Sequence, residues 1–379
     1  MDSHHLSNVI KETKIRLCLD CGKCTTFCPV NSYNSDFNPR RMIQKTVNSN
    51  NTNPQDELIW SCLNCLACQQ FCNYSVKFPE FMTAVRAEAA SQGVKVQCSH
   101  GGALQSMMHM MAAGRTTQKR LDWLPVDVKL VPDSETIFFV GCAPYFDVLF
   151  QDLGVRTLGG VIGALRLLNR SGIAFRLMEN ERCCGRDLLL QGDVSGFRKL
   201  AEANQSEFKR QGVKRIITYC PECLVCLKKD YPAALGNQDI QVVNLVELLA
   251  PLAQEKKLKL SGFKKKVTFH DPCTLGRGAG LYEEPRQLLK SMDGLDLLEM
   301  ESNRERALCC GASPWAACNS VNRQIQGKRL AQAEAAAEML VTACPKCQIH
   351  FKCAQKGLEN PVSQIEVKDL AELLSADHQ

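Results

Sequence analysis

Eighteen of the 22 cysteines in this chain of 379 residues fall into four sets with regular internal spacing. Two sets are short runs of the pattern Cys-x-x-Cys-x-x-Cys-x-x-x-Cys. The other two are longer: a lone cysteine, then Cys-Cys-Gly, then Cys-x-x-Cys, with each step spanning roughly 35 to 40 residues. Thiolates at such spacings are typical ligands of iron–sulfur clusters. The pattern predicts four clusters in one chain and a role in moving electrons.

The short runs predict two cubane [4Fe-4S] clusters with crossed ligands, because three thiolates of a run bind one cubane and the fourth binds the other. Pro29 follows the first run, whereas Asn73 follows the second. Lys23, between two ligands, either raises the potential of its cluster or is simply exposed. The expected ligands are Cys18, Cys21, Cys24 and Cys72 for one cluster, and Cys62, Cys65, Cys68 and Cys28 for the other.

The long sets lie in a duplicated region, because matching cysteines of the two copies are 124 to 131 residues apart. The sets are Cys142, Cys183, Cys184, Cys220 and Cys223 in the first copy, and Cys273, Cys309, Cys310, Cys344 and Cys347 in the second. Five thiols are one more than a cubane needs. The surplus indicates either a cluster of another shape or a thiolate left free for chemistry.

Local patterns place these cysteines at the ends of strands. Proline after Cys220 and Cys344 suits the first turn of a helix, where backbone N–H groups stabilise a thiolate. Cys142 and Cys273 come just after apolar strand-like runs. The glycine of each Cys-Cys-Gly is expected to let the backbone approach a bulky inorganic core.

The elements that must position these residues predict an α+β multidomain protein. Residues 1–100 are expected to form an all-α ferredoxin domain with two clusters, and residues 101–133 a connector. Residues 134–255 and 256–379 are then two α/β, Rossmann-like repeats, because apolar strand runs alternate with helical patterns. One example is the helical pattern from Ala331 to Met339, followed by a strand run that ends at Thr342.

Composition excludes several classes of protein. A net charge of +6 without a run of like charges argues against nucleic-acid binding. The polar N-terminus and the lack of a long apolar stretch predict no signal peptide and no membrane span. No Gly-x-Gly-x-x-Gly follows a strand, so we expect no flavin or nicotinamide site. These features predict a cytoplasmic location, with any attachment to the inner face of a membrane made through a partner.

The paired Cys-Cys-Gly (CCG) repeats resemble the catalytic subunit of heterodisulfide reductase, and the short runs resemble its helical ferredoxin partner. The chain is similar to a fusion of the two, and also to the iron–sulfur subunits of glycolate and glycerol-3-phosphate dehydrogenases. The resemblance implies that each set of five cysteines holds a noncubane [4Fe-4S] cluster and that cubanes deliver single electrons to the pair. It also implies partners: a flavoprotein of the heterodisulfide reductase A type, a hydrogenase or dehydrogenase subunit, or a membrane cytochrome.

The resembled family often has histidine at two positions that are Arg186 and Thr274 in this chain. A proton donor for a departing thiolate is therefore missing at these positions. Candidates for other roles are His270, which either tunes a cluster or only closes a strand, and Arg186 and Arg277, which either neutralise cluster charge or are solvated.

Residues outside the four sets are expected to have structural roles. Cys226 should reach the same helix face as Cys223 but remain a buried free thiol. Methionines between Met107 and Met111 should pack between domains, with a docking surface as the alternative. The remaining cysteines without a set are Cys98, Cys318 and Cys353.

Two functions follow from these patterns. The first is an electron-transfer subunit of an anaerobic oxidoreductase complex, in which a partner does the chemistry. The second is an enzyme subunit that acts directly on a thiol or disulfide, with a quinone-linked dehydrogenase subunit as a further alternative. The missing histidines favour the relay.

Overall fold

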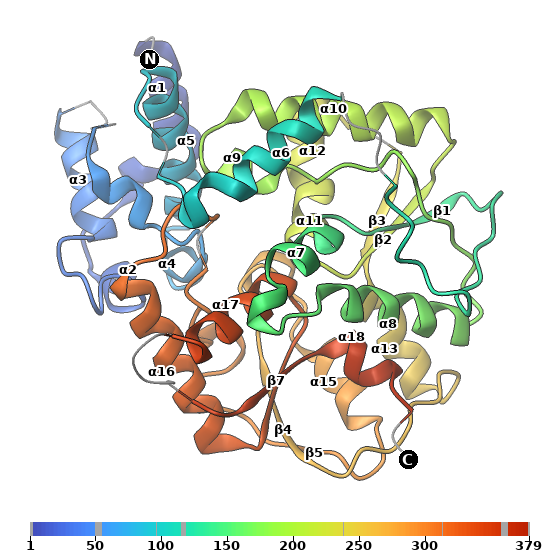
Figure 1. Cartoon of the computed structure of the whole chain (residues 1–379). Coiled ribbons are helices and arrows are strands. Elements are labelled where there is room, and N and C mark those ends of the chain that lie inside the picture. The colour runs from blue at the N-terminus through green and yellow to red at the C-terminus, as the bar shows by residue number, and fades with distance from the viewer. Residues whose placement is uncertain are drawn as a thin grey trace.

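The computed structural model describes residues 3–49, 55–95, 97–114, 119–237, 239–312, 314–357 and 363–377. A helical N-terminal region is followed by two parallel sheets with helices packed around them (Figure 1). The predicted combination of an all-α region with a duplicated α/β region is confirmed.

Helices and turns are the regular elements of the described part of residues 3–114. The cysteine runs form two matching short helices, and each begins after a left-handed residue, Gly22 at φ 81° and Leu66 at φ 64°. Such residues turn the chain sharply, so that each run can wrap around one centre. The helices are α1 (Ser3–Glu12), α2 (Lys23–Thr26), α3 (Pro39–Ser49), α4 (Ala67–Gln70), α5 (Phe78–Ser91) and α6 (Ala103–Ala113).

The first sheet has the parallel order β1-β2-β3. Its strands are short and apolar, as in sheets that are covered on both faces. They are β1 (Thr136–Phe139), β2 (Arg215–Thr218) and β3 (Gln241–Asn244). The accompanying helices are α7 (Ala143–Leu149), α8 (Thr157–Arg170), α9 (Arg186–Leu190), α10 (Val194–Arg210), α11 (Pro221–Val225), α12 (Tyr231–Leu235) and α13 (Leu245–Gln254), with a π-helical turn at Cys226–Asp230.

The second sheet has the order β5-β4-β6-β7 and is also parallel. The helix predicted to reach Met339 ends at Ala336, because Met339 begins a strand. The strands are β4 (Lys266–His270), β5 (Asp296–Leu297), β6 (Met339–Thr342) and β7 (Glu366–Asp369). The helices are α14 (Gly276–Ala279), α15 (Glu283–Lys290), α16 (Ser320–Ala336), α17 (Pro345–Gln355) and α18 (Leu370–Ser375).

The two α/β units pack through the same contact made twice. Helix α8 contacts α18, and the corresponding helices α15 and α13 contact each other. Gly163 allows the close approach of α8, because a Cβ atom there would lie 2.4 Å from the carbonyl oxygen of Ala371. The duplicated units are therefore joined around an approximate two-fold axis.

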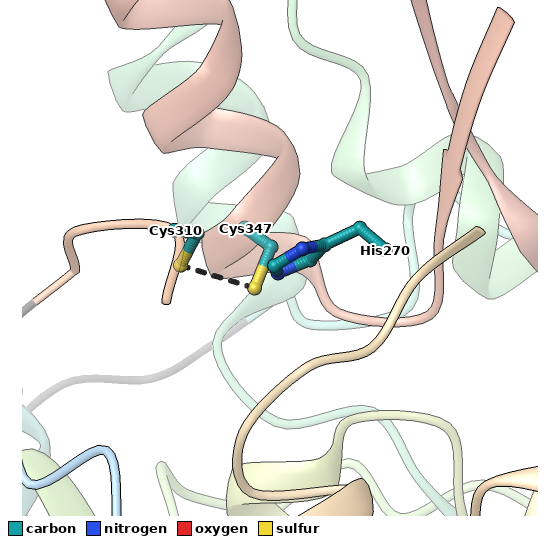
Figure 2. Close-up of side chains that lie close together, drawn as sticks. All are labelled: His270, Cys310 and Cys347. Atoms are coloured by element: carbon teal, nitrogen blue, oxygen red, sulfur yellow. Dashed lines mark hydrogen bonds between the residues drawn. The ribbon is translucent and has the colours of Figure 1, made fainter. Parts of the chain in front are cut away.

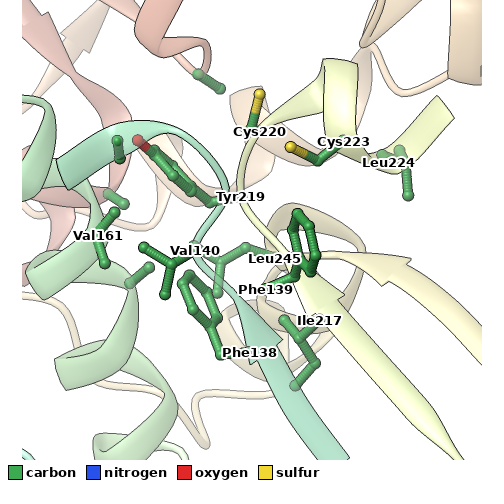
Figure 3. Close-up of a cluster of buried hydrophobic side chains, with 14 of the residues drawn as sticks. Phe138, Phe139, Val140, Val161, Ile217, Tyr219, Cys220, Cys223, Leu224 and Leu245 are labelled. Atoms are coloured by element: carbon green, nitrogen blue, oxygen red, sulfur yellow. The ribbon is translucent and has the colours of Figure 1, made fainter. Parts of the chain in front are cut away.

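An apolar core supports the strand ends that carry cysteines. In the first unit, Phe138 and Phe139 of β1 and Ile217 of β2 are fully buried below Cys220 and Cys223 (Figure 3). Each such side chain contributes about 1.5–3 kcal/mol on burial. The core therefore holds the ends of these strands in fixed positions.

Candidate iron–sulfur site

All 22 cysteines are free thiols. No disulfide therefore competes for the predicted ligands, and every thiol of the four sets is available to bind iron. Most of the ten cysteines of the long sets are buried, with Cys142 and Cys273 partly exposed. Buried thiols without disulfides suit structural cluster ligands better than they suit a secreted disulfide framework.

The first long set converges at the carboxyl ends of β1 and β2. The Sγ atoms of Cys142 and Cys183 are 2.8 Å apart, and those of Cys184 and Cys223 are 3.7 Å apart. Cys220 is hydrogen-bonded to Cys223. The five thiols thus face one another, which is the arrangement that a single inorganic core requires.

The second long set has the same arrangement in the other sheet. The Sγ atoms of Cys310 and Cys347 are 3.2 Å apart. Cys309 is hydrogen-bonded to Cys273 and Cys310, and Cys344 to Cys347. Hydrogen bonds from Cys309 and Cys347 hold the pKa of Cys310 well below its usual value. Cys310, the second cysteine of its Cys-Cys-Gly segment, is thus favoured as a thiolate, the form that binds iron.

The helix starts at the Cys-x-x-Cys segments are as predicted. Cys220 and Cys344 are the N-cap residues of α11 and α17, and a proline occupies the first turn of each helix. The backbone N–H groups of that turn are directed toward the cysteines, so these ends favour negative sulfur.

The glycines of the two Cys-Cys-Gly segments lie against helices, whereas the sequence predicted that they face the inorganic core. Gly185 and Gly311 have φ angles of +82° and +74°, but a Cβ atom at either position would meet a helix rather than a sulfur atom. At Gly311 the nearest atom would be the carbonyl oxygen of Asn322 in α16, at 2.9 Å. The close approach to a thiol occurs at Gly141, where a Cβ atom would lie 3.0 Å from the Sγ of Cys223.

The short runs lie side by side with their ends exchanged. Burial is the main cause of the raised pKa of Cys28, and Cys65 and Cys62 raise it further because they are close. At the other end, Lys23 Nζ donates a hydrogen bond of 3.0 Å to the side chain of Asn73, the residue after Cys72. These contacts bring each run's fourth cysteine toward the other run.

Two further contacts fix the short runs. Phe27 and Phe71, which precede the fourth cysteines, stack with ring centroids 3.8 Å apart. Arg86 is fully buried and donates hydrogen bonds of 2.9 Å to the carbonyl oxygen of Ile59 and 2.6 Å to that of Cys62. Buried arginines need such partners. The sequence patterns did not identify Arg86, because most of its partners are backbone carbonyl oxygens, which no sequence motif marks.

The second short run touches the second long set. The thiols of Cys65 and Cys309 lie next to each other, and the Cys309 thiol lowers the pKa of Cys65. Arg277 lies at the same junction: its Nε donates to the carbonyl oxygen of Cys65 at 2.7 Å, and its Nη1 to that of Ala307 at 2.9 Å. Arg277 is therefore a connecting residue and is not solvated.

Arg186 and Thr274 bind the same carboxylate. Arg186 Nε donates to Glu222 at 2.9 Å, and the Thr274 hydroxyl donates to the other oxygen of Glu222, also at 2.9 Å. A second guanidinium nitrogen of Arg186 donates to Asp230. No sequence pattern singled out Glu222, which comes from the first unit while Thr274 comes from the second.

A second ion pair joins the units near this carboxylate. Lys346 Nζ lies 2.6 Å from Asp187, and both side chains are nearly buried. Lys346 and Glu222 stand at matching positions of the two Cys-Pro-x-Cys segments. A narrow cleft runs between the units here, and its lining includes Cys273, Cys344, Glu222 and Lys346.

Each long set also has a buried arginine–carboxylate pair behind its first cysteine. In the first unit, Glu181 accepts hydrogen bonds from Arg120 at 2.6 Å and from the backbone of Gly141 at 2.7 Å. In the second unit, Arg286 donates to Asp271 at 2.6 Å. Neither pair was predicted, because its partners come from different elements of the chain, 61 residues apart in the first pair and 15 in the second.

His270 closes β4 and lies beside the second long set. Its Nδ1 accepts a hydrogen bond of 3.1 Å from Arg329, and burial lowers its pKa. One ring nitrogen is within 4.8 Å of the sulfur atoms of Cys310 and Cys347 (Figure 2). His270 is thus both a strand-closing residue and a neighbour of the predicted ligands.

The other residues that the sequence analysis singled out lie outside the four cysteine sets. Cys226 is fully buried, and its Sγ donates to the carbonyl oxygen of Cys184 at 3.3 Å. Met107, Met108 and Met111 are buried in the core, whereas Met110 is exposed. Cys98 and Cys318 are exposed, and Cys353 is partly buried. In the described parts of the chain, no helix combines the length and apolar character needed to cross a membrane.

Two protein families match the chain. The family described as "4Fe-4S dicluster domain" matches residues 10–73, and the family described as "Cysteine-rich domain" matches residues 137–228 and again residues 267–352. The chain joins a 4Fe-4S dicluster domain to a duplicated cysteine-rich CCG domain. It is therefore an iron–sulfur protein of the electron-transfer kind.

The chain is similar to three named proteins over most of its length. One of the subunits of dihydromethanophenazine:CoB–CoM heterodisulfide reductase from Methanosarcina barkeri is 27% identical over 99% of this chain and 96% of its own. EtfAB:quinone oxidoreductase from Syntrophomonas wolfei is 28% identical over 94% of this chain and 57% of its own. One of the subunits of fumarate reductase (CoM/CoB) from Methanothermobacter marburgensis is 27% identical over 95% of this chain and 72% of its own.

Proposed function

We propose that this protein is an electron-relay subunit of a redox complex. Two cubane clusters on the short runs exchange electrons with two further [4Fe-4S] clusters, of noncubane type, on the long sets. The proposed ligands are the 18 cysteines of the four sets, divided as the spacing predicts. The proposed division into domains likewise follows residues 1–100, 101–133, 134–255 and 256–379.

The contact between Cys65 and Cys309 carries this proposal. It brings a ligand of a proposed cubane against a ligand of the second long set, so the two clusters would be neighbours. Cys220 of the first set is in turn close enough to Cys344 of the second set to raise the pKa of the Cys344 thiol. The four sets therefore support one continuous line: first run, second run, second long set, first long set.

The surroundings of Glu222 favour a relay over direct chemistry. Arg186 and Thr274 both donate hydrogen bonds to Glu222. They stand at the two positions where heterodisulfide reductases, which this chain resembles, often have histidine. Arg186 is fully engaged, because it also binds Asp230. Neither side chain is free to protonate a departing thiolate. The cleft residues thus bind one another.

The names of the relatives support the same role. One is named as a heterodisulfide reductase subunit, one as a quinone oxidoreductase and one as a fumarate reductase subunit. Their named reactions differ, so electron transfer is the property that these chains have in common. We propose that the partner of this chain is a flavoprotein, a dehydrogenase or hydrogenase subunit, or a membrane cytochrome, and that the complex is cytoplasmic.

Direct action on a thiol or disulfide is the second candidate function. The cleft is lined by Cys273 and Cys344, so a thiol or disulfide that entered it would meet cysteines of the second long set. Electron paramagnetic resonance (EPR) of the oxidised protein with an added thiol separates the two functions. A new paramagnetic species formed from the thiol indicates an enzyme, and an unchanged spectrum indicates a relay.

Anoxic purification tests the proposed clusters. We expect about 16 iron atoms per chain, four for each of four [4Fe-4S] clusters. Cys65→Ser should lose the iron of one cubane, whereas Cys98→Ser, at an exposed cysteine outside the four sets, should retain all of it. Colourless wild-type protein without iron would refute the proposed function.

A further inference from the structure

The second long cysteine set has a buried imidazole beside its sulfur atoms, and the described residues of the first set include none. His270 is 1% exposed, and one ring nitrogen lies within 4.8 Å of the Sγ atoms of both Cys310 and Cys347. Figure 2 shows the ring beside the two sulfur atoms. Its position at the end of β4 is fixed by the sheet, because His270 pairs with Thr342 of β6.

The hydrogen-bond partner of His270 determines where its proton lies. Arg329 Nε is 3.1 Å from His270 Nδ1, and arginine can only donate. Nδ1 must therefore be an acceptor, so the ring is neutral and its proton is on Nε2. Nε2 is buried and makes no hydrogen bond of ordinary geometry with the described residues, although the Cys310 thiol lies close enough to interact with the ring. A buried N–H group without a partner is costly, so this donor is available for a ligand atom.

A second imidazole repeats this arrangement. His350 is three residues after Cys347 on α17 and is 4% exposed. Its Nδ1 is 3.1 Å from the side-chain amide nitrogen of Gln326, and its Nε2 is also buried without a hydrogen-bond partner among the described residues. Gln326 and Arg329 are one turn apart on α16. One helix thus orients both rings.

The first long set has no such donors at the matching positions. Phe139 is the last residue of β1 and pairs with Thr218, as His270 pairs with Thr342. Cys226 is three residues after Cys223, as His350 is three residues after Cys347. Phe139 cannot donate a hydrogen bond, and Cys226 already donates to the carbonyl oxygen of Cys184. The difference between the sets is therefore built into matching positions of the duplicated fold.

We propose that His270 donates an N–H hydrogen bond to a sulfur atom of the cluster on the second long set, and so makes that cluster the more easily reduced of the two. Reduction adds one negative charge, and N–H groups directed at sulfur stabilise that charge. One electron is gained, no bond is broken, and the Nε2 proton stays on the ring. This proposal rests on the proposed function, because it requires that both long sets hold clusters.

His270 is a positioning residue in this scheme and exchanges no electrons or protons itself. The first electron to reach the pair of long sets should remain on the second set, which adjoins the short runs through Cys65 and Cys309. The proposal thus assigns different roles to two sites whose cysteine patterns are the same.

The test compares substitutions at His270 in the full-length, anoxically purified protein. His270→Phe copies the first set, and the new ring can keep the edge contact that His270 makes with Phe351, at 4.9 Å between centroids. His270→Gln retains an N–H donor. His109→Phe is the control, because His109 is half-exposed and binds Asp193. The readout is a redox titration of the cluster signals followed by EPR.

We expect His270→Phe to lower the potential of one signal and leave the others unchanged. The equilibrium between the two long-set clusters should shift about tenfold, or about 59 mV for a one-electron couple. His270→Gln should shift it less, and His109→Phe should not shift it. Unchanged potentials in His270→Phe would overturn this proposal, while wild-type protein lacking long-set clusters would overturn the proposed function itself.

Hyperfine spectroscopy of the wild-type protein gives an answer even if His270→Phe loses its cluster. With ¹⁵N-labelled histidine, the affected signal should show weak nitrogen coupling and coupling to a proton that exchanges in D₂O. Absence of the exchangeable proton would overturn the proposal. Strong nitrogen coupling would also overturn it, because it would make His270 a direct iron ligand.

Discussion

Glu181 and Arg120 form the most deeply buried ion pair behind the first long set. Their side chains are 0% and 1% exposed, and Glu181 also accepts hydrogen bonds from the backbone of Val140 and Gly141. These bonds hold the loop that ends at Cys142. Burial raises the pKa of Glu181 despite the nearby guanidinium, so desolvation outweighs the attraction between the charges. Glu181 and Arg120 therefore stabilise the folded protein only together, because either charge alone would be buried without a counter-ion.

Glu181→Gln should therefore be strongly destabilising. Val140 and Gly141 donate to different oxygens of Glu181, so the amide keeps an acceptor for only one of these N–H groups. It also leaves the charge of Arg120 buried without a counter-ion. Removing one partner of a buried pair costs about 3–5 kcal/mol. At about 2–4 °C per kcal/mol for a unit of this size, the melting temperature should fall by roughly 6–20 °C. Replacing both residues, in Arg120→Met with Glu181→Gln, should recover much of this loss.

Anoxic thermal denaturation, followed by circular dichroism, measures this effect. Asp127→Asn is the control, because Asp127 and Arg166 form a well-aligned pair on the surface that should contribute nothing measurable. A melting temperature for Glu181→Gln equal to that of the wild type would refute the reasoning. A double variant less stable than Glu181→Gln would refute it too, because the stranded charge would then not be the cause.

Two more substitutions test the fold. Gly163→Ala should destabilise the junction of α8 and α18 by about 1–3 kcal/mol, because its Cβ atom would clash with the carbonyl oxygen of Ala371; an unchanged melting temperature would contradict this. Burial raises the pKa of Asp369 to about 7, so the folded protein holds a proton there that the unfolded chain releases above about pH 4. The stability that Asp369 contributes is thus greatest below pH 4 and is lost as the pH rises to 7. Asp369→Asn can still cap α18, so its free energy of unfolding relative to the wild type should increase between pH 5 and pH 8, by at most about 4 kcal/mol. Melting temperatures across this pH range measure the increase. A difference between variant and wild type that does not change with pH would contradict the assignment.

Much of the architecture could be predicted from the sequence, because its signals are local. Ligand spacing is set by the reach of a few residues, so the cysteine patterns pointed to the two domain types that the family matches confirm. The apolar runs before Cys142 and Cys273, and the run that ends at Thr342, predicted strands where the structure has β1, β4 and β6. Proline after Cys220 and Cys344 predicted the helix starts that the structure has.

Only the tertiary structure decided how these parts meet. The contact between Cys65 and Cys309 joins residues that are far apart in the chain, and so does the shared binding of Arg186 and Thr274 to Glu222. In sequence, the two α/β repeats have the same pattern of five cysteines. Packing against α16 turns His270 toward the second set, whereas Phe139 fills that place in the first. Contacts of this kind depend on which helix covers which strand end, and no local spacing encodes that choice.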